Sequence, residues 1–64
     1  MSDKNIIIMF EQYIKNKDYA NAKSMIHYYK EQSMLALTIN NKELYNKLNN
    51  LTIELTKRFP NRIM

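Results

Sequence analysis

Cysteine and glycine are absent from this sequence of 64 residues, and proline occurs once, at Pro60. Without cysteine the chain has no disulfide, no thiolate metal ligand and no thiol nucleophile. Without glycine, turns that need a positive φ are hard to build, and helices are seldom interrupted. Valine is also absent and threonine is confined to Thr38, Thr52 and Thr56, so little in the chain favours strands. These absences predict an all-α protein.

The residues that are present support the same prediction, because Leu, Met, Lys, Glu, Gln and Ala all favour helices. Hydrophobic residues make up 45% of the chain, which is typical of a folded domain. We expect one helical domain over 1–64. A chain of this size buries only roughly 60% of its unfolded surface, so its stability alone is marginal. Because disulfides are excluded, we expect a partner protein or a homodimer to supply further burial.

The longest apolar run, at 6–10, is followed by Glu11. It is too short for the core of a signal peptide or for a membrane span, so we expect a cytoplasmic protein with no membrane contact. Heavy use of Asn, Lys and Ile without Gly indicates AT-rich coding DNA. That composition favours a low-GC bacterium, its phage or a plasmid as the source.

Apolar residues at helical spacing predict three helices, at about 3–15, 19–39 and 42–59. Their inward stripes are Ile6, Phe10, Tyr13 and Ile14 in the first, with Met9 beside them; Ala22, Met25, Ile26, Tyr29, Ala36 and Leu37 in the second; and Leu44, Leu48, Leu51 and Leu55 in the third. Asp18 is expected to cap the second helix, and Pro60 to end the third. Gln32 and Ser33 mark the one place where the middle helix can break, and the sequence leaves its continuity open.

The two Asn-rich corners between the helices resemble each other. Segments 14–18 and 39–43 match so that Asn16 aligns with Asn41 and Lys17 with Lys42, and Asn16 is the expected left-handed cap of the first helix. An internal duplication explains the match, and so do two independent solutions to one helix–turn–helix corner. In both cases the short turns predict antiparallel neighbours and an up-down-up three-helix bundle.

No set of residues has the pattern of a catalytic or cofactor site. The chain lacks a Gly-rich phosphate loop and a nucleophile elbow. Asp3 and Asp18 are best explained as helix caps, and the four Glu residues fall on helix faces between polar neighbours. His27 and Glu31 lie one helical turn apart, but a metal needs three or four ligands. We expect no enzyme activity, no cofactor and no metal, and therefore a function based on binding.

The basic balance keeps nucleic acid open as a partner, since the formal net charge is +4 and the isoelectric point is near 9.5. Positive residues are spread over all three predicted helices, and Lys57, Arg58 and Arg62 form the one local cluster. A helix that reads bases carries Arg, Asn or Gln on one face. The nearest approach to such a face is Asn46, Asn49 and Asn50, and most such faces are simply solvated.

Several apolar residues lie off the predicted core stripes, and they are more informative than the charge. These candidate protein-contact residues are Ile8, Tyr28, Met34, Leu35 and Ile53. A single exposed apolar residue is ordinary, but several together, rich in Tyr and Met, indicate a contact surface. The alternative is that the long middle helix is buried on two sides by its own neighbours. We favour the contact surface, used by a larger protein or, without one, by a second copy.

Two family resemblances agree with this interpretation. Segment 36–51 resembles the IDEAL motif, a short helical module of small regulatory proteins of Firmicutes, through Ala36-Leu37, Asn41-Lys42-Glu43, Tyr45, Leu48 and Leu51. The Ile-Asp pair of that motif is replaced here by Ser33-Met34. Segments 35–40 and 44–48 are also similar to the haemolysin-modulator family, although its acidic Ala-Ala-Asp-His-Arg segment has no counterpart. Both resemblances imply a small helical regulator that acts on proteins.

The sequence therefore predicts a small, non-enzymatic regulatory protein. It would act as an adaptor or inhibitor, encoded by a bacterium, phage or plasmid, and bind a larger protein through an apolar and aromatic helix face. The alternative is a basic helical nucleic-acid-binding protein or a small transcriptional regulator.

Overall fold

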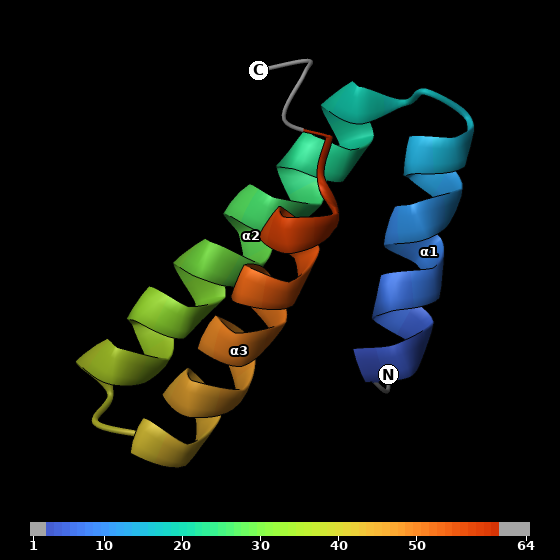
Figure 1. Ribbon diagram of the computed structural model, residues 1–64. Coiled ribbons are helices and arrows are strands. Elements are labelled where there is room, and N and C mark those ends of the chain that lie inside the picture. The colour runs from blue at the N-terminus through green and yellow to red at the C-terminus, as the bar shows by residue number, and fades with distance from the viewer. Residues whose placement is uncertain (1–2, 61–64) are drawn as a thin grey trace.

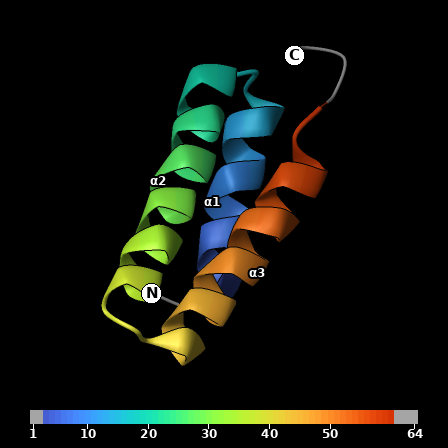
Figure 2. The ribbon, with the colours of Figure 1, turned by 90° about the vertical axis from the view of Figure 1, so that its left-hand side faces the viewer.

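The chain folds as an all-α three-helix bundle in the computed structural model, which describes residues 3–60 (Figure 1). The helices are α1 (Asp3–Lys15), α2 (Tyr19–Thr38) and α3 (Lys42–Arg58). Short turns join them, and each helix runs antiparallel to the one before it (Figures 1 and 2). The predicted fold class and the three predicted helices are confirmed.

The middle helix is continuous through Gln32 and Ser33. Ser33 is buried, and its hydroxyl donates a hydrogen bond of 2.6 Å to the backbone carbonyl of Lys30 in the same helix. Because a serine side chain can satisfy itself in this way, a polar residue inside the packing does not require a break.

Two helices end one residue earlier than predicted. α2 ends at Thr38 and not at Ile39, whose backbone N–H still donates to a helix carbonyl in the cap position. α3 ends at Arg58, and Phe59 is extended, with φ −75° and ψ 131°. The ring of Pro60 excludes helical geometry at the residue before it, which explains this end.

Both turns use the same backbone geometry. Lys17 and Asn40 take left-handed conformations, with φ of 60° and 62°. Each turn carries a pair of nested hydrogen bonds from backbone N–H to backbone carbonyl: Lys17 to Ile14 at 3.0 Å and Asp18 to Tyr13 at 2.8 Å, then Asn40 to Leu37 at 3.0 Å and Asn41 to Ala36 at 2.9 Å. This pairing is the Schellman motif, which satisfies the last carbonyls of a helix.

The prediction that Asn16 is the left-handed cap is wrong. The N–H of Asn16 donates to the carbonyl of Gln12 at 3.0 Å, so Asn16 still continues the hydrogen bonding of α1. The left-handed residue is therefore Lys17. A lysine is less favourable there than glycine, which has no Cβ to crowd the following carbonyl, or asparagine, whose short polar side chain can hydrogen-bond locally.

The two turns are equivalent in a different register from the sequence match. Asp18 and Asn41 are both N-caps, and each side-chain oxygen accepts from the backbone N–H three residues later, at 3.5 Å and 3.1 Å. Lys17 thus corresponds to Asn40, whereas the sequence match aligns Lys17 with Lys42. This difference of two residues favours independent solutions to the same corner over duplication.

The core lies where α1 packs against the hairpin of α2 and α3. Its buried residues are Ile6, Phe10, Ala22, Leu51, Leu55 and Phe59. Phe10 and Leu55 are the largest fully buried side chains, and Tyr19 packs edge-on against Phe59 with ring centroids 6.1 Å apart. A single small cluster therefore holds all three helices together.

The contact between α2 and α3 is the most extensive in the bundle. The residues that α2 buries are all small: Ala22, Ser33 and Ala36. On α3, Thr52 is buried, and its hydroxyl donates to the carbonyl of Leu48 at 2.9 Å. The small side chains that α2 buries let the two backbones approach closely, while α3 buries the larger Leu51 and Leu55. Hydrophobic spacing missed Ser33 and Thr52 because both are polar.

The first helix covers only part of this hairpin. α1 has 13 residues and α2 has 20, so α1 is about 10 Å shorter at 1.5 Å per residue. The pKa of Tyr29 is raised, first by burial, then by the neighbouring Tyr28 and third by the Asp3 carboxylate. Because Asp3 is the first residue of α1, the start of α1 lies near Tyr29. In both ribbon views the hairpin extends past that start (Figures 1 and 2). We call residues 34–44, the end of the hairpin beyond α1, the hairpin tip.

The difference in length between α1 and the hairpin explains why two residues of the predicted core stripes are exposed. Leu37 and Leu44 are exposed because they lie in the hairpin tip, where no third helix covers them. Met9 is also exposed, since it lies at the margin of the α1 stripe. Leu48 is half-buried, and Leu51 and Leu55 are buried as predicted.

Truncating leucines of α3 to alanine should show that burial increases from the hairpin tip towards the core. Leu55→Ala, at a side chain with no exposure, should cost about 2–5 kcal/mol of the free energy of unfolding. The matched control Leu44→Ala makes the same change in the same helix at a residue 39% exposed, and should cost under about 1 kcal/mol. Urea unfolding followed by circular dichroism measures both. Equal losses would contradict the proposed position of the core.

Candidate functional site

The five candidate contact residues are all exposed, each by 45% to 56% of its surface. The structure does not bring all five together. Ile8 lies on α1 and Ile53 on α3, and each shares its helix face mainly with polar residues. Tyr28, Met34 and Leu35 lie on α2, and Tyr28 and Leu35 share one face because they are two helical turns apart. Only these last three belong to a common region.

The hairpin tip holds a larger apolar cluster than the sequence predicted. Its exposed large hydrophobic residues are Met34, Leu35, Leu37, Ile39 and Leu44, with exposed fractions from 39% to 69%. Ala36, between them, is buried but lies outside the main core cluster. Leu37 and Leu44 were predicted as core residues, which assumes a third helix along the full length of the hairpin. Ile39 was placed at the end of the middle helix and in neither a core stripe nor the contact surface. The shorter first predicted helix was the signal that could have revealed them.

Charges of both signs flank this apolar cluster. Lys42 and Glu43 open α3 within the tip, and Lys30 and Glu31 lie about one turn before it on α2. All four are exposed, and none forms an ion pair within residues 3–60. A shallow hollow lined by Asn41, Glu43, Leu44 and Lys47 lies beside the turn. The tip is thus an apolar surface with a mixed polar rim, which is the composition of a protein contact site.

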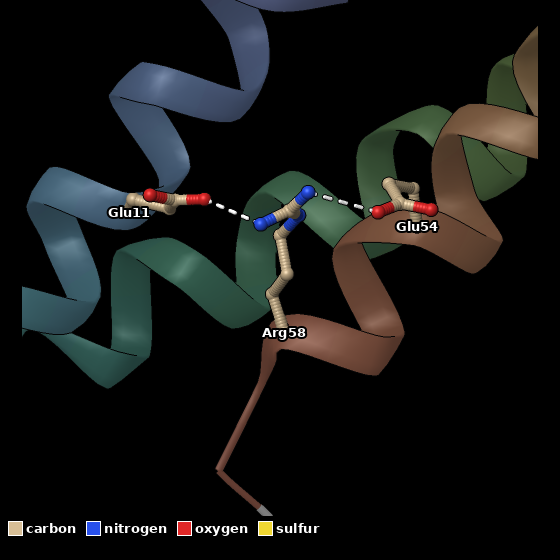
Figure 3. Close-up of polar contacts among 3 residues, drawn as sticks. All are labelled: Glu11, Glu54 and Arg58. Atoms are coloured by element: carbon tan, nitrogen blue, oxygen red, sulfur yellow. Dashed lines mark hydrogen bonds and ion pairs between the residues drawn. The ribbon is translucent and has the colours of Figure 1, made fainter.

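Arg58, a predicted nucleic-acid contact, is instead engaged by two carboxylates (Figure 3). Its Nη1 lies 2.6 Å from Oε1 of Glu11 on α1, and its Nη2 lies 2.9 Å from Oε1 of Glu54 on α3. The Glu11 pair joins the last turn of α3 to α1. Because all three side chains are well exposed, each pair contributes little to stability.

The predicted basic cluster is therefore weaker than its sequence suggests. Arg58 is neutralised by its neighbours, and Arg62 lies outside the described residues. Lys57 is exposed and shares the end of the bundle with Lys15 and Lys17, opposite the hairpin tip. Lys15 and Lys57 lie in the last turns of their helices, where a positive charge complements the helix dipole. A structural role thus accounts for part of this charge.

The described residues form neither a metal site nor a membrane span. No group of three or more His, Cys, Asp or Glu side chains in that part of the chain is placed to hold a metal ion. His27 and Glu31 are both exposed on α2. None of the helices described is long and apolar enough to cross a membrane.

The fold and its surface define a small all-α three-helix bundle with an apolar hairpin tip at one end and a basic region at the other. No protein-family model, curated protein or solved structure matches the chain. The resemblances to the IDEAL motif and to the haemolysin-modulator family stay predictions. In the structure, segment 36–51 forms the end of α2, the turn and the first half of α3, and so includes most of the hairpin tip.

Removing the Arg58 ion pairs should have a small effect that depends on salt. Arg58→Gln should lower the free energy of unfolding by less than about 1 kcal/mol at low ionic strength, because water's high dielectric constant and the entropy lost by long side chains keep exposed pairs weak. The loss should shrink in about 1 M salt, where the Debye length is about 3 Å. The control is Lys57→Gln, which removes an adjacent positive charge without an ion pair. Thermal unfolding of both variants at two salt concentrations tests this, and a loss unchanged by salt would contradict it.

Proposed function

We propose that this chain is a small, non-enzymatic regulatory protein that binds another protein through its hairpin tip. The observation that carries the proposal is the group of five exposed apolar side chains on the one end of the hairpin that α1 does not cover. Binding alone suits an adaptor or an inhibitor, which changes the activity of its partner by covering a surface.

The size of the apolar tip supports this proposal. Five apolar side chains exposed by 39% to 69% together present roughly 400–500 Å² of apolar surface around one end of the hairpin, spread over more than one side of α2. Leaving such a surface in water is costly for a domain whose core is so small. A partner that covers the tip would therefore gain binding energy and also stabilise the fold.

The aromatic residue beside the tip suits an interface anchor. Tyr28 is exposed, yet its ring packs edge-on against Tyr29, with ring centroids 5.0 Å apart. A ring that is already oriented loses little conformational entropy when a partner covers it. Met34 adds a flexible side chain that adapts to an uneven surface. Tyr28 and Met34 thus extend the proposed contact along α2.

The backbone of the tip is also well defined before binding. Asn40 closes α2 through the Schellman motif, and the Asn41 side chain caps α3. The two helix ends are therefore held in a fixed relation to each other. A surface of this kind needs little reorganisation on binding, which favours affinity.

Nucleic-acid binding is the second candidate, favoured by the shared position of Lys15, Lys17 and Lys57 at the end opposite the tip. Against it, the cluster described contains no unpaired arginine, since Arg58 is held by Glu11 and Glu54. Three lysines provide charge but no bidentate contact to a base.

The salt dependence of duplex DNA binding should separate the two candidates. We expect weak binding that does not depend on sequence and is lost by physiological ionic strength, because few phosphates are neutralised. Fluorescence anisotropy of labelled duplexes over a range of salt concentrations measures this. Tight, sequence-selective binding at physiological salt would favour the nucleic-acid function over ours.

Charge placed in the tip should abolish partner binding without unfolding the domain. Leu35→Glu should leave helicity nearly unchanged, because Leu35 is 53% exposed, and should remove partners captured from native host extract. Ile53→Glu is the matched control, since Ile53 is 45% exposed but lies outside the tip. Affinity capture with quantitative mass spectrometry compares wild type and both variants. Equal capture by all three would exclude the tip as the binding surface.

A further inference from the structure

We infer that a second copy of this chain covers the hairpin tip when no other protein does, in a two-fold symmetric dimer joined tip to tip. This inference rests on the proposed function, because it assigns an occupant to the same surface. The contact residues would come from the ends of α2 and α3 that α1 leaves uncovered.

The area of the tip is sufficient for a small dimer interface. Two tips together expose roughly 800–1,000 Å² of apolar surface, which is an upper limit to the apolar area of the contact because residues on opposite sides of α2 cannot all face one copy. With the polar rim, the interface reaches at most about 1,200 Å², where stable interfaces begin. An interface at this lower limit is typical of a weak, reversible dimer. Such a dimer would dissociate when a better partner competes for the same residues.

The charges of the rim are complementary to themselves. In a two-fold symmetric contact the same patch meets itself, so each positive group needs a negative group nearby. Lys42 and Glu43 are adjacent, exposed and without an ion pair inside the described chain. In the dimer, Lys42 of each copy would approach Glu43 of the other. Likewise, Lys30 of each copy would approach Glu31 of the other.

The distribution of charge also favours contact through the tip. Each copy carries a net charge of +4, so two copies repel each other. Lys30 and Lys42 near the tip each have a glutamate next to them in the chain. Lys15, Lys17 and Lys57, which form no ion pair within residues 3–60, lie at the other end of a molecule 37 Å long. A tip-to-tip dimer keeps these groups much farther apart than the Debye length of about 8 Å at physiological ionic strength. A parallel side-by-side dimer would bring them together.

Sedimentation equilibrium over a hundredfold range of concentration tests whether the dimer exists. We expect a mass that rises from 7.7 kDa towards twice that value. Leu35→Glu and Ile39→Glu should each weaken dimerisation by roughly tenfold or more, and Ile53→Glu should leave it within about twofold. Helicity measured by circular dichroism confirms that each variant is folded. A constant mass of 7.7 kDa for the wild type overturns the inference.

Charge exchange tests the symmetry. Lys42→Glu alone and Glu43→Lys alone place like charges opposite each other, so each should weaken its own dimer. An equal mixture of the two variants restores opposite charges and should form a mixed dimer at lower concentration than either variant alone. Failure of the mixture to associate better than its components overturns the two-fold arrangement.

Single cysteines test the orientation, because the natural chain has none. Thr38→Cys places an exposed thiol at the end of α2 in the tip, and Asn16→Cys places one at the opposite turn. Under mild oxidation Thr38→Cys should form a disulfide-linked dimer readily, and Asn16→Cys should not. Preferential cross-linking through Asn16→Cys overturns the inference.

Together with partner capture, these results separate the two proposals. A wild type that stays monomeric while Leu35→Glu loses its partner overturns the dimer and leaves the proposed function supported. A tip-to-tip dimer whose variants do not change partner capture supports the dimer and overturns the proposed function.

Discussion

The packing of α1 against the α2–α3 hairpin is the contact on which the rest of the structure depends. Ile6 and Phe10 bring α1 into the one core cluster, where they join Leu51, Leu55 and Phe59. A hairpin of two helices presents one long apolar face, and a third helix can bury only as much of that face as its own length allows. Because α1 is shorter than α2, the core ends where α1 begins, and every property of the tip follows from that limit.

Because α1 is shorter than the hairpin, the two ends of the bundle differ. At one end, the last turns of α1 and α3 carry Lys15 and Lys57, and Arg58 links α3 to α1 through Glu11. At the other end, aliphatic side chains surround the α2–α3 turn. Helices with the opposite arrangement, a long α1 and a short hairpin, would hide the apolar end. Under the proposed function, stability and binding are coupled, since the surface that would complete the core is also the surface that a partner would cover.

The turns show how a chain without glycine builds tight corners. A Schellman motif needs a left-handed residue, and Lys17 and Asn40 supply it in spite of their side chains. The N-caps Asp18 and Asn41 follow at once, so one residue ends a helix and the next begins another. The energetic cost of the left-handed lysine is offset by hydrogen bonds that leave few helix-end groups unsatisfied. The fixed geometry of the second turn is what holds the tip in shape.

The sequence by itself determined the fold class, the three helices, the N-cap Asp18 and the helix-ending role of Pro60, because these depend on local propensity and spacing. The capping role of Asn41 was seen only in the structure. It also identified Tyr28, Met34 and Leu35 as residues off the core stripes. Only the tertiary structure decided that Ile8 and Ile53 stand apart from them, that Leu37 and Leu44 are exposed, and that Arg58 is paired with Glu11. The spacing of apolar residues shows which side of a helix each residue occupies. Its burial depends on whether another helix extends to the same level along the bundle axis. That depends on how three helices of unequal length are placed in space.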